Sequence, residues 1–143
     1  MSSTFPSSLL SPQLSQLVVI DVQEKLLPAI CEPHKLTTAI RFLMDAAAIL
    51  QVSTIITEQY PKGLGTTIEP LRQHAATIMT LEKLQFSAAE TLIQGAWNAE
   101  TSETAVPDSG PGQIVLVGIE THVCVQQTAL ELCRRGVQVF VAA

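Results

Sequence analysis

Three side chains of different chemistry each stand at or just beyond the end of a short apolar stretch of the sequence. Asp21 ends LVVID, Lys83 follows a weaker apolar stretch, and Cys124 follows QIVLVG after a short turn. A carboxylate can take a proton, a thiol can attack a carbonyl carbon, and an ammonium group can stabilise negative charge. Each also has an ordinary interpretation, as a turn cap, a surface charge and a small buried hydrophobe respectively.

Cys124 lies where the sequence predicts a change from strand to helix. Residues 113–118 are apolar and β-branched, which is typical of a strand buried on both faces. From Val123 apolar residues recur at helical spacing, and Gly136 is expected to end the helix. Unpaired N–H groups and the positive dipole end in the first turn favour a thiolate. The position therefore favours a catalytic Cys124.

Strands and helices alternate along the chain, and this order decides where the three side chains lie. Alternation predicts parallel pairing with right-handed crossovers, in an open three-layer α/β sheet of Rossmann-like type that is flanked by helices. Asp21, Lys83 and Cys124 would then share the carboxyl edge of the sheet, where α/β sites form. The expected strands cover residues 17–21, 52–57, 76–80, 113–118 and 137–142.

Three further residues are candidates for lining a substrate pocket at this edge. Gln23 closely follows the aspartate, Tyr60 belongs to a turn-rich loop at residues 58–70, and Phe86 offers an apolar wall near the lysine. The loop has neither a nucleotide-binding glycine pattern nor paired histidines. We therefore expect no metal site and no cofactor.

Composition limits the classes of partner. The chain has 143 residues, 47% of them hydrophobic, and a net charge of −5, which argues against nucleic-acid or anionic-membrane binding. No apolar stretch approaches the ~20 residues that span a bilayer, and no signal peptide is recognisable. Three cysteines without a CxxC pair indicate reduced thiols in a cytoplasmic protein, with Cys31 and Cys133 as packing residues. Residues 1–16 are interpreted as a flexible N-terminal arm and residues 17–143 as the domain.

Several of these segments together resemble the isochorismatase-like cysteine hydrolases. The similar segments are VVIDVQ around Asp21, K-x-x-F-S from Lys83 and GIETHVCVQQTA from Gly118. The TEQYPKGLG loop at residues 57–65 brings the chain closest to the isochorismatase domain-containing branch. In that family the sheet has six strands in the order 3-2-1-4-5-6, so we expect a domain that is incomplete at its C-terminus and lacks the last strand and helix.

The resemblance implies a reaction and a set of roles. Cys124 would be the nucleophile, Asp21 the base and Lys83 the third member of the triad. A cis peptide would join Ile119 to Glu120, and the backbone N–H groups of Glu120 and Cys124 would form an oxyanion hole. The substrate would be a small molecule with an amide-like C–N bond, hydrolysed through a thioester, and the protein would form a homo-oligomer if the fold is complete.

Two departures from the wider family narrow this reaction. Nicotinamidases carry a metal-binding Asp-x-His set where this chain has Glu58-Gln59-Tyr60, which counts against that activity and against zinc. Isochorismatases proper cleave a vinyl ether without a cysteine nucleophile, so Cys124 counts against their reaction. The alternative from another class is a non-catalytic binding protein, or an inactive truncated copy of such a hydrolase.

Overall fold

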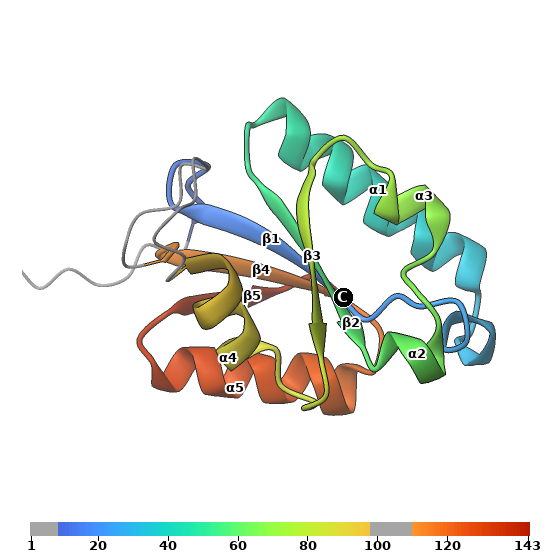
Figure 1. The fold of residues 1–143 in the computed structure, drawn as a ribbon. Coiled ribbons are helices and arrows are strands. Elements are labelled where there is room, and N and C mark those ends of the chain that lie inside the picture. The colour runs from blue at the N-terminus through green and yellow to red at the C-terminus, as the bar shows by residue number, and fades with distance from the viewer. Residues whose placement is uncertain (1–8, 98–109) are drawn as a thin grey trace, which may run out of the picture.

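The computed structural model describes residues 9–97 and 110–143 and shows one parallel sheet with helices on both faces (Figure 1). The strand order is β3-β2-β1-β4-β5, and every neighbouring pair is parallel. This confirms the predicted α/β sheet flanked by helices. The strands are β1 (Ser15–Ile20), β2 (Thr54–Gln59), β3 (Thr77–Lys83), β4 (Gln113–Gly118) and β5 (Gln138–Val141).

The helices are divided between the two faces because the chain reverses its direction across the sheet. From β1 to β3 it moves one way, and from β3 it returns past β1 to β4, so right-handed crossovers place the later helices on the opposite face. None of the described helices is long and apolar enough to cross a membrane. The helical segments are η1 (Leu27–Ala29), α1 (Pro33–Ile49), α2 (Pro61–Leu64), α3 (Glu69–Arg72), α4 (Ala89–Leu92), η2 (Ile93–Trp97), η3 (Thr121–Val125) and α5 (Gln126–Arg134).

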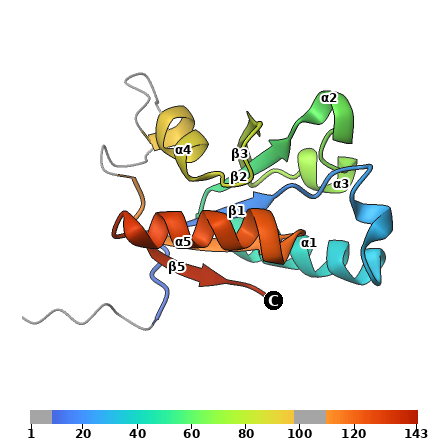
Figure 2. The same cartoon turned by 90° about the horizontal axis from the view of Figure 1, so that it is seen from below.

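The central strand β1 is buried on both faces, which explains its unbroken apolar sequence. Val18 and Ile20 pack in one cluster with α4 and α5, while Leu17 and Val19 pack in another with α1 and α3. Figure 2 shows α5 lying over one face of the sheet, along the strands. The edges of the sheet are β3 and β5. The strand order reverses between β1 and β4. At such a reversal the loops leave neighbouring strands in opposite directions and open a crevice. Asp21 follows β1 and Cys124 follows β4, so both residues lie at this crevice.

The N-terminal boundary of the sheet differs from the expected one. The first strand begins at Ser15, before Leu17, and Gln16 is buried. The Gln16 side chain accepts a hydrogen bond from Trp97 Nε1 at 2.9 Å, which ties this strand to the η2 turn. Residues 1–8 of the expected arm lie outside the described residues.

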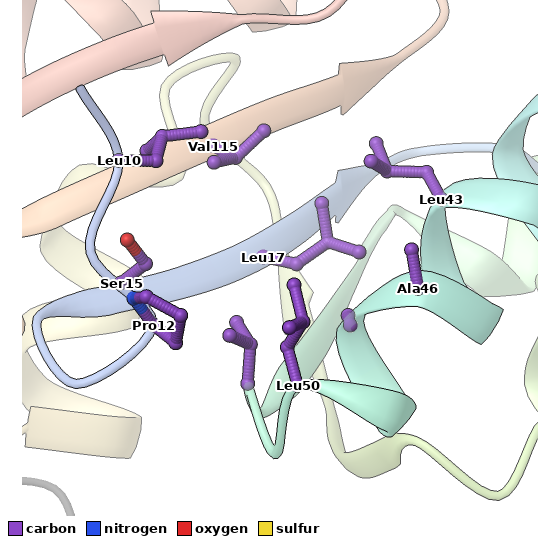
Figure 3. Close-up of a pocket in the computed structure, with 10 residues that line it drawn as sticks. Leu10, Pro12, Ser15, Leu17, Leu43, Ala46, Leu50 and Val115 are labelled. Atoms are coloured by element: carbon purple, nitrogen blue, oxygen red, sulfur yellow. The ribbon is translucent and has the colours of Figure 1, made fainter.

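An apolar hollow lies on the α1 face, between the end of α1 and strands β1 and β4 (Figure 3). Its volume is about 170 Å³, and Leu17, Leu43 and Val115 project into it. Among residues 9–97 and 110–143, Ser15 contributes the only polar side chain that lines it, and its hydroxyl donates to the Ser11 carbonyl at 2.7 Å. These lining residues include no acid, base or thiol.

Candidate active site

The carboxyl ends of β1, β3 and β4 bring the three predicted reactive side chains together. Lys83 Nζ lies 2.7 Å from Asp21 Oδ2. The Asp21 carboxylate also acts on the Cys124 thiol, whose pKa it raises. All three residues are buried, with exposed fractions of 0% for Asp21 and 4% for Lys83 and Cys124. The carboxylate thus interacts with both the ammonium and the thiol.

Asp21 is held by groups from two neighbouring strands. Thr57 Oγ1 donates to Asp21 Oδ1 at 2.8 Å, and Lys83 donates to Oδ2. The Asp21 backbone has a φ of 53°, in the left-handed region that aspartate tolerates better than most residues. Backbone strain of this kind persists where surrounding contacts fix it and is common at functional sites.

The Lys83 ammonium has no donor left for a substrate. Besides Asp21, it donates to Gln59 Oε1 at 2.8 Å and to the carbonyl oxygens of Gln85 and Phe86 at 3.2 and 2.9 Å. These four acceptors exceed its three N–H donors. A buried ion pair is tolerated when its polar atoms are satisfied in this way. Lys83 is therefore placed to hold the Asp21 carboxylate and not to contact a substrate.

The turn before Cys124 is built from glycine and left-handed backbone. Gly118 has a φ of 151°, and a Cβ there would lie 2.2 Å from the Ile20 carbonyl oxygen. Only glycine allows β4 to approach β1 this closely at the site. Glu120 has a φ of 59°, and its carbonyl accepts from the N–H of Val123 at 2.9 Å, which opens the helical turn.

This turn differs from the one that the family resemblance implies. The described residues contain no cis peptide bond, so Ile119 and Glu120 are joined in the trans form. The left-handed conformation of Glu120 reverses the chain without the cis bond. The N–H groups of Glu120 and Cys124 stay a predicted oxyanion hole, at the first turn of the helix.

The Cys124 thiol is protonated at neutral pH, in contrast to the expected thiolate. Burial raises the pKa of Cys124 to about 12, helped by the hydrogen bond to Asp21 and by the negative charge of that carboxylate. The positive charge of Lys83 opposes the shift but is outweighed. Desolvation and an anionic neighbour therefore override the effect of the helix N-terminus, and Cys124 needs a base to become a nucleophile.

Gln23 takes a different role from the predicted pocket position. It is fully buried, and its Nε2 donates to the carbonyls of Gln59 and Gly65 at 2.9 and 2.7 Å. Its Oε1 accepts from the Gln59 N–H at 2.7 Å. Because backbone groups engage both ends of the amide, Gln23 holds the loop after β2 against the sheet and has little capacity left to contact a substrate.

Tyr60 and Phe86 lie at the rim of the site. Tyr60 is half exposed and borders, with Lys83 and Leu84, a hollow of about 420 Å³. Phe86 is 54% exposed, and its carbonyl is one of the Lys83 acceptors. Both remain candidates for contact with a substrate. Another hollow, of about 290 Å³, opens at residues 118–122 against Ile30 and Leu36.

Sequence reasoning missed Thr57 and Gln59, which hold Asp21 and Lys83 respectively. Both lie at the polar end of β2, two residues apart, and therefore on the same side of the strand. Their polarity at the end of an apolar strand was the available signal. Cys31 and Cys133 are exposed and do not pack in the core, in contrast to the prediction. Among the described residues, no cluster of three or more potential metal ligands occurs.

Comparison with known proteins places these features in a family. The sequence profile of the Isochorismatase domain matches residues 15–143. Isochorismatase domain-containing protein 1 of Danio rerio is 36% identical over 134 residues, which are 94% of this chain and 44% of that protein. Isochorismatase domain-containing protein 2 of Rattus norvegicus is 36% identical over 131 residues, which are 92% and 57% of the two chains.

A solved structure, that of the MAR1 ribonuclease from Caenorhabditis elegans, superposes with a TM-score of 0.78 and 38% identity. The match covers 93% of this chain and 64% of that one. The chain thus spans about half to two thirds of the length of these relatives. The profile match and these similarities show that the chain belongs to the isochorismatase family.

Proposed function

We propose that this chain is a cysteine hydrolase that cleaves an amide-like C–N bond of a small molecule through a thioester. One observation carries the proposal. Cys124 is a buried thiol whose pKa is raised by burial and by Asp21, and Lys83 Nζ lies 2.7 Å from that carboxylate. A thiol with so high a pKa gains a nucleophilic role only beside a base, and Asp21 is that base.

The first half of the reaction forms the acyl-enzyme. Asp21 takes the thiol proton while the Cys124 sulfur attacks the carbonyl carbon of the substrate. The carbonyl oxygen becomes an oxyanion, which the N–H groups of Glu120 and Cys124 would bind. When the tetrahedral intermediate collapses, the C–N bond breaks and Asp21 returns its proton to the leaving nitrogen. The products are a free amine, or ammonia, and a Cys124 thioester.

The second half restores the enzyme. Asp21 takes a proton from water as the water oxygen attacks the thioester carbonyl, and the proton passes to the departing sulfur. Lys83 stays bound to Asp21 through both halves, so it holds the carboxylate in place. The steps use side chains and water, with no metal or cofactor, and the reduced thiol that they need fits a cytoplasmic protein. The expected homo-oligomer stays a prediction that analytical ultracentrifugation would test.

The direct test is to trap the thioester. The chain is incubated with a panel of small primary and secondary amides, amine release is measured, and intact-protein mass spectrometry follows any adduct. We expect turnover by the wild type and an acyl adduct on the Cys124 peptide. Cys124→Ala should abolish both while keeping the fold, and Cys133→Ser, at an exposed thiol, should change neither. Turnover that survives Cys124→Ala would overturn the proposal.

The near-complete burial of Cys124 favours a second candidate, a binding protein without turnover. This candidate predicts that a small amide binds with no adduct, and that Cys124→Ala leaves the affinity unchanged. An RNA substrate belongs in the same panel because the similar Caenorhabditis elegans protein is described as a ribonuclease. The net charge of −5 argues against binding to a phosphate backbone, so we expect no cleavage of RNA.

A further inference from the structure

Thr57 contacts Asp21 through both its backbone and its side chain. It is fully buried in β2 and pairs with Ile20, the residue before Asp21. The Thr57 carbonyl accepts the Asp21 N–H at 3.1 Å, and the Thr57 hydroxyl donates to Asp21 Oδ1 at 2.8 Å. The register of β1 and β2 therefore sets this threonine directly beside the carboxylate.

The two oxygens of Asp21 are held from different strands. The Thr57 hydroxyl on β2 holds Oδ1, and Lys83 Nζ on β3 holds Oδ2 at 2.7 Å. One donor alone would let the carboxylate turn about its terminal bond, whose torsion is broad. Two donors fix the plane of the carboxylate and thus the directions of its lone pairs, one of which accepts the Cys124 proton in the proposed reaction.

We propose that Thr57 is a positioning residue, whose hydroxyl holds the Asp21 carboxylate in the orientation that accepts the Cys124 proton. This inference rests on the proposed function, in which Asp21 is the base. Thr57 acts through Asp21, because its hydroxyl donates to Asp21 Oδ1. A hydrogen bond to a charged group contributes about 1.5–3 kcal/mol, which corresponds to about a 10- to 100-fold change in rate.

The same strand offers a matched control. Thr54 is also fully buried in β2, and its hydroxyl has no hydrogen-bond partner within the described part of the chain. Thr54→Val and Thr57→Val therefore remove the same atom from the same strand, and only the second change removes a contact with Asp21. Thr57→Ser keeps the hydroxyl and serves as the rescue variant.

The experiment measures alkylation of Cys124 by iodoacetamide between about pH 5 and 9, by peptide mass spectrometry, with Cys31 and Cys133 as internal references. We expect Thr57→Val to slow the reaction at Cys124 about tenfold or more at neutral pH. The acid limb of its pH profile should move to higher pH, because the carboxylate loses a donor to its charged form. Thr57→Ser should restore most of the rate, and Thr54→Val should match the wild type.

Asp21→Asn distinguishes failure of the base role from failure of the positioning role. If Asp21→Asn leaves the rate and the pH profile unchanged, the base role fails, and the proposed function and this inference fall together. If Asp21→Asn abolishes the fast reaction but Thr57→Val behaves like Thr54→Val, only the positioning role is overturned. The positioning role is also overturned if Thr57→Val lowers thermal stability and leaves the pH profile of Cys124 unmoved.

Discussion

The carboxyl edge of the sheet and the apolar hollow of Figure 3 are lined by different kinds of side chain. At the edge, Asp21, Lys83 and Thr57 are buried polar groups, and each is engaged in hydrogen bonds. The hollow is lined almost wholly by aliphatic side chains such as Leu17 and Leu43. The apolar hollow thus offers little for catalysis. The candidate site is identified by paired polar groups that converge at the strand ends.

The two regions should also respond differently to substitution. In the hollow, stability comes from apolar contact, so the loss should follow the amount of buried surface removed. At the carboxyl edge, stability depends on pairing, so removal of one partner leaves an uncompensated buried charge. Variants in the two regions can therefore test whether the contrast holds.

The largest effect is expected for Lys83→Met. This change leaves the Asp21 carboxylate buried without its cation, which should lower the free energy of unfolding by about 3–5 kcal/mol. Urea denaturation followed by circular dichroism measures the loss. Lys35→Met is the control, since that side chain is 78% exposed and its ion pair with Glu32 lies on the surface. If Lys83→Met and Lys35→Met had the same free energy of unfolding, stability at the carboxyl edge would not depend on this buried ion pair, and the contrast with the apolar hollow would fail.

An intermediate effect is expected for Leu17→Ala in the hollow. Leu17 is 2% exposed, and its truncation should lower the free energy of unfolding by about 2–3 kcal/mol by the same denaturation measurement. Leu50→Ala, at a 55% exposed residue of the same hollow, should cost less than about 1 kcal/mol. Neither change should alter the pH profile of Cys124 alkylation. A shifted profile in Leu17→Ala would mean that the two regions are coupled.

The smallest effect is expected for Thr54→Val. Its buried hydroxyl lacks a partner among the described residues, so its replacement by a methyl group should leave stability unchanged or raise it by about 1 kcal/mol. Differential scanning calorimetry would detect the change as an equal or higher melting temperature. A clear loss of stability would show that this hydroxyl has a partner and that Thr54 is not a fair control for Thr57.

Much of this arrangement could be predicted from the sequence, because topology follows from pattern. Apolar stretches alternating with helical segments imply a parallel sheet, and a parallel sheet brings Asp21, Lys83 and Cys124 to one edge. The roles of Thr57 and Gln23 could not be predicted in this way. Their partners depend on strand register and loop path, which link residues tens of positions apart.

The protonation state of Cys124 shows where position in the sequence misleads. A cysteine at a helix N-terminus suggests a thiolate, but the sequence does not reveal how deeply the sulfur is buried or that Asp21 lies beside it. The exposure of Cys133 has a simpler origin. Its neighbour Leu132 is fully buried on the inner face of α5, which turns Cys133 toward solvent. The helical spacing of apolar residues alone is compatible with Cys133 facing either the core or the solvent.

The most direct test of the central claim compares the pH profile of Cys124 alkylation in the wild type and in Asp21→Asn. The Cys124 thiol and the Asp21 carboxylate titrate as a coupled pair. In the wild type, the rate of Cys124 alkylation should therefore stay constant through neutral pH, where Asp21 can accept the thiol proton. Asp21→Asn should lose this plateau, and its rate should rise with pH as the thiol ionises alone. A faster neutral-pH reaction in Asp21→Asn would mean that the Asp21 charge only raises the pKa of Cys124, and would contradict its role as the base.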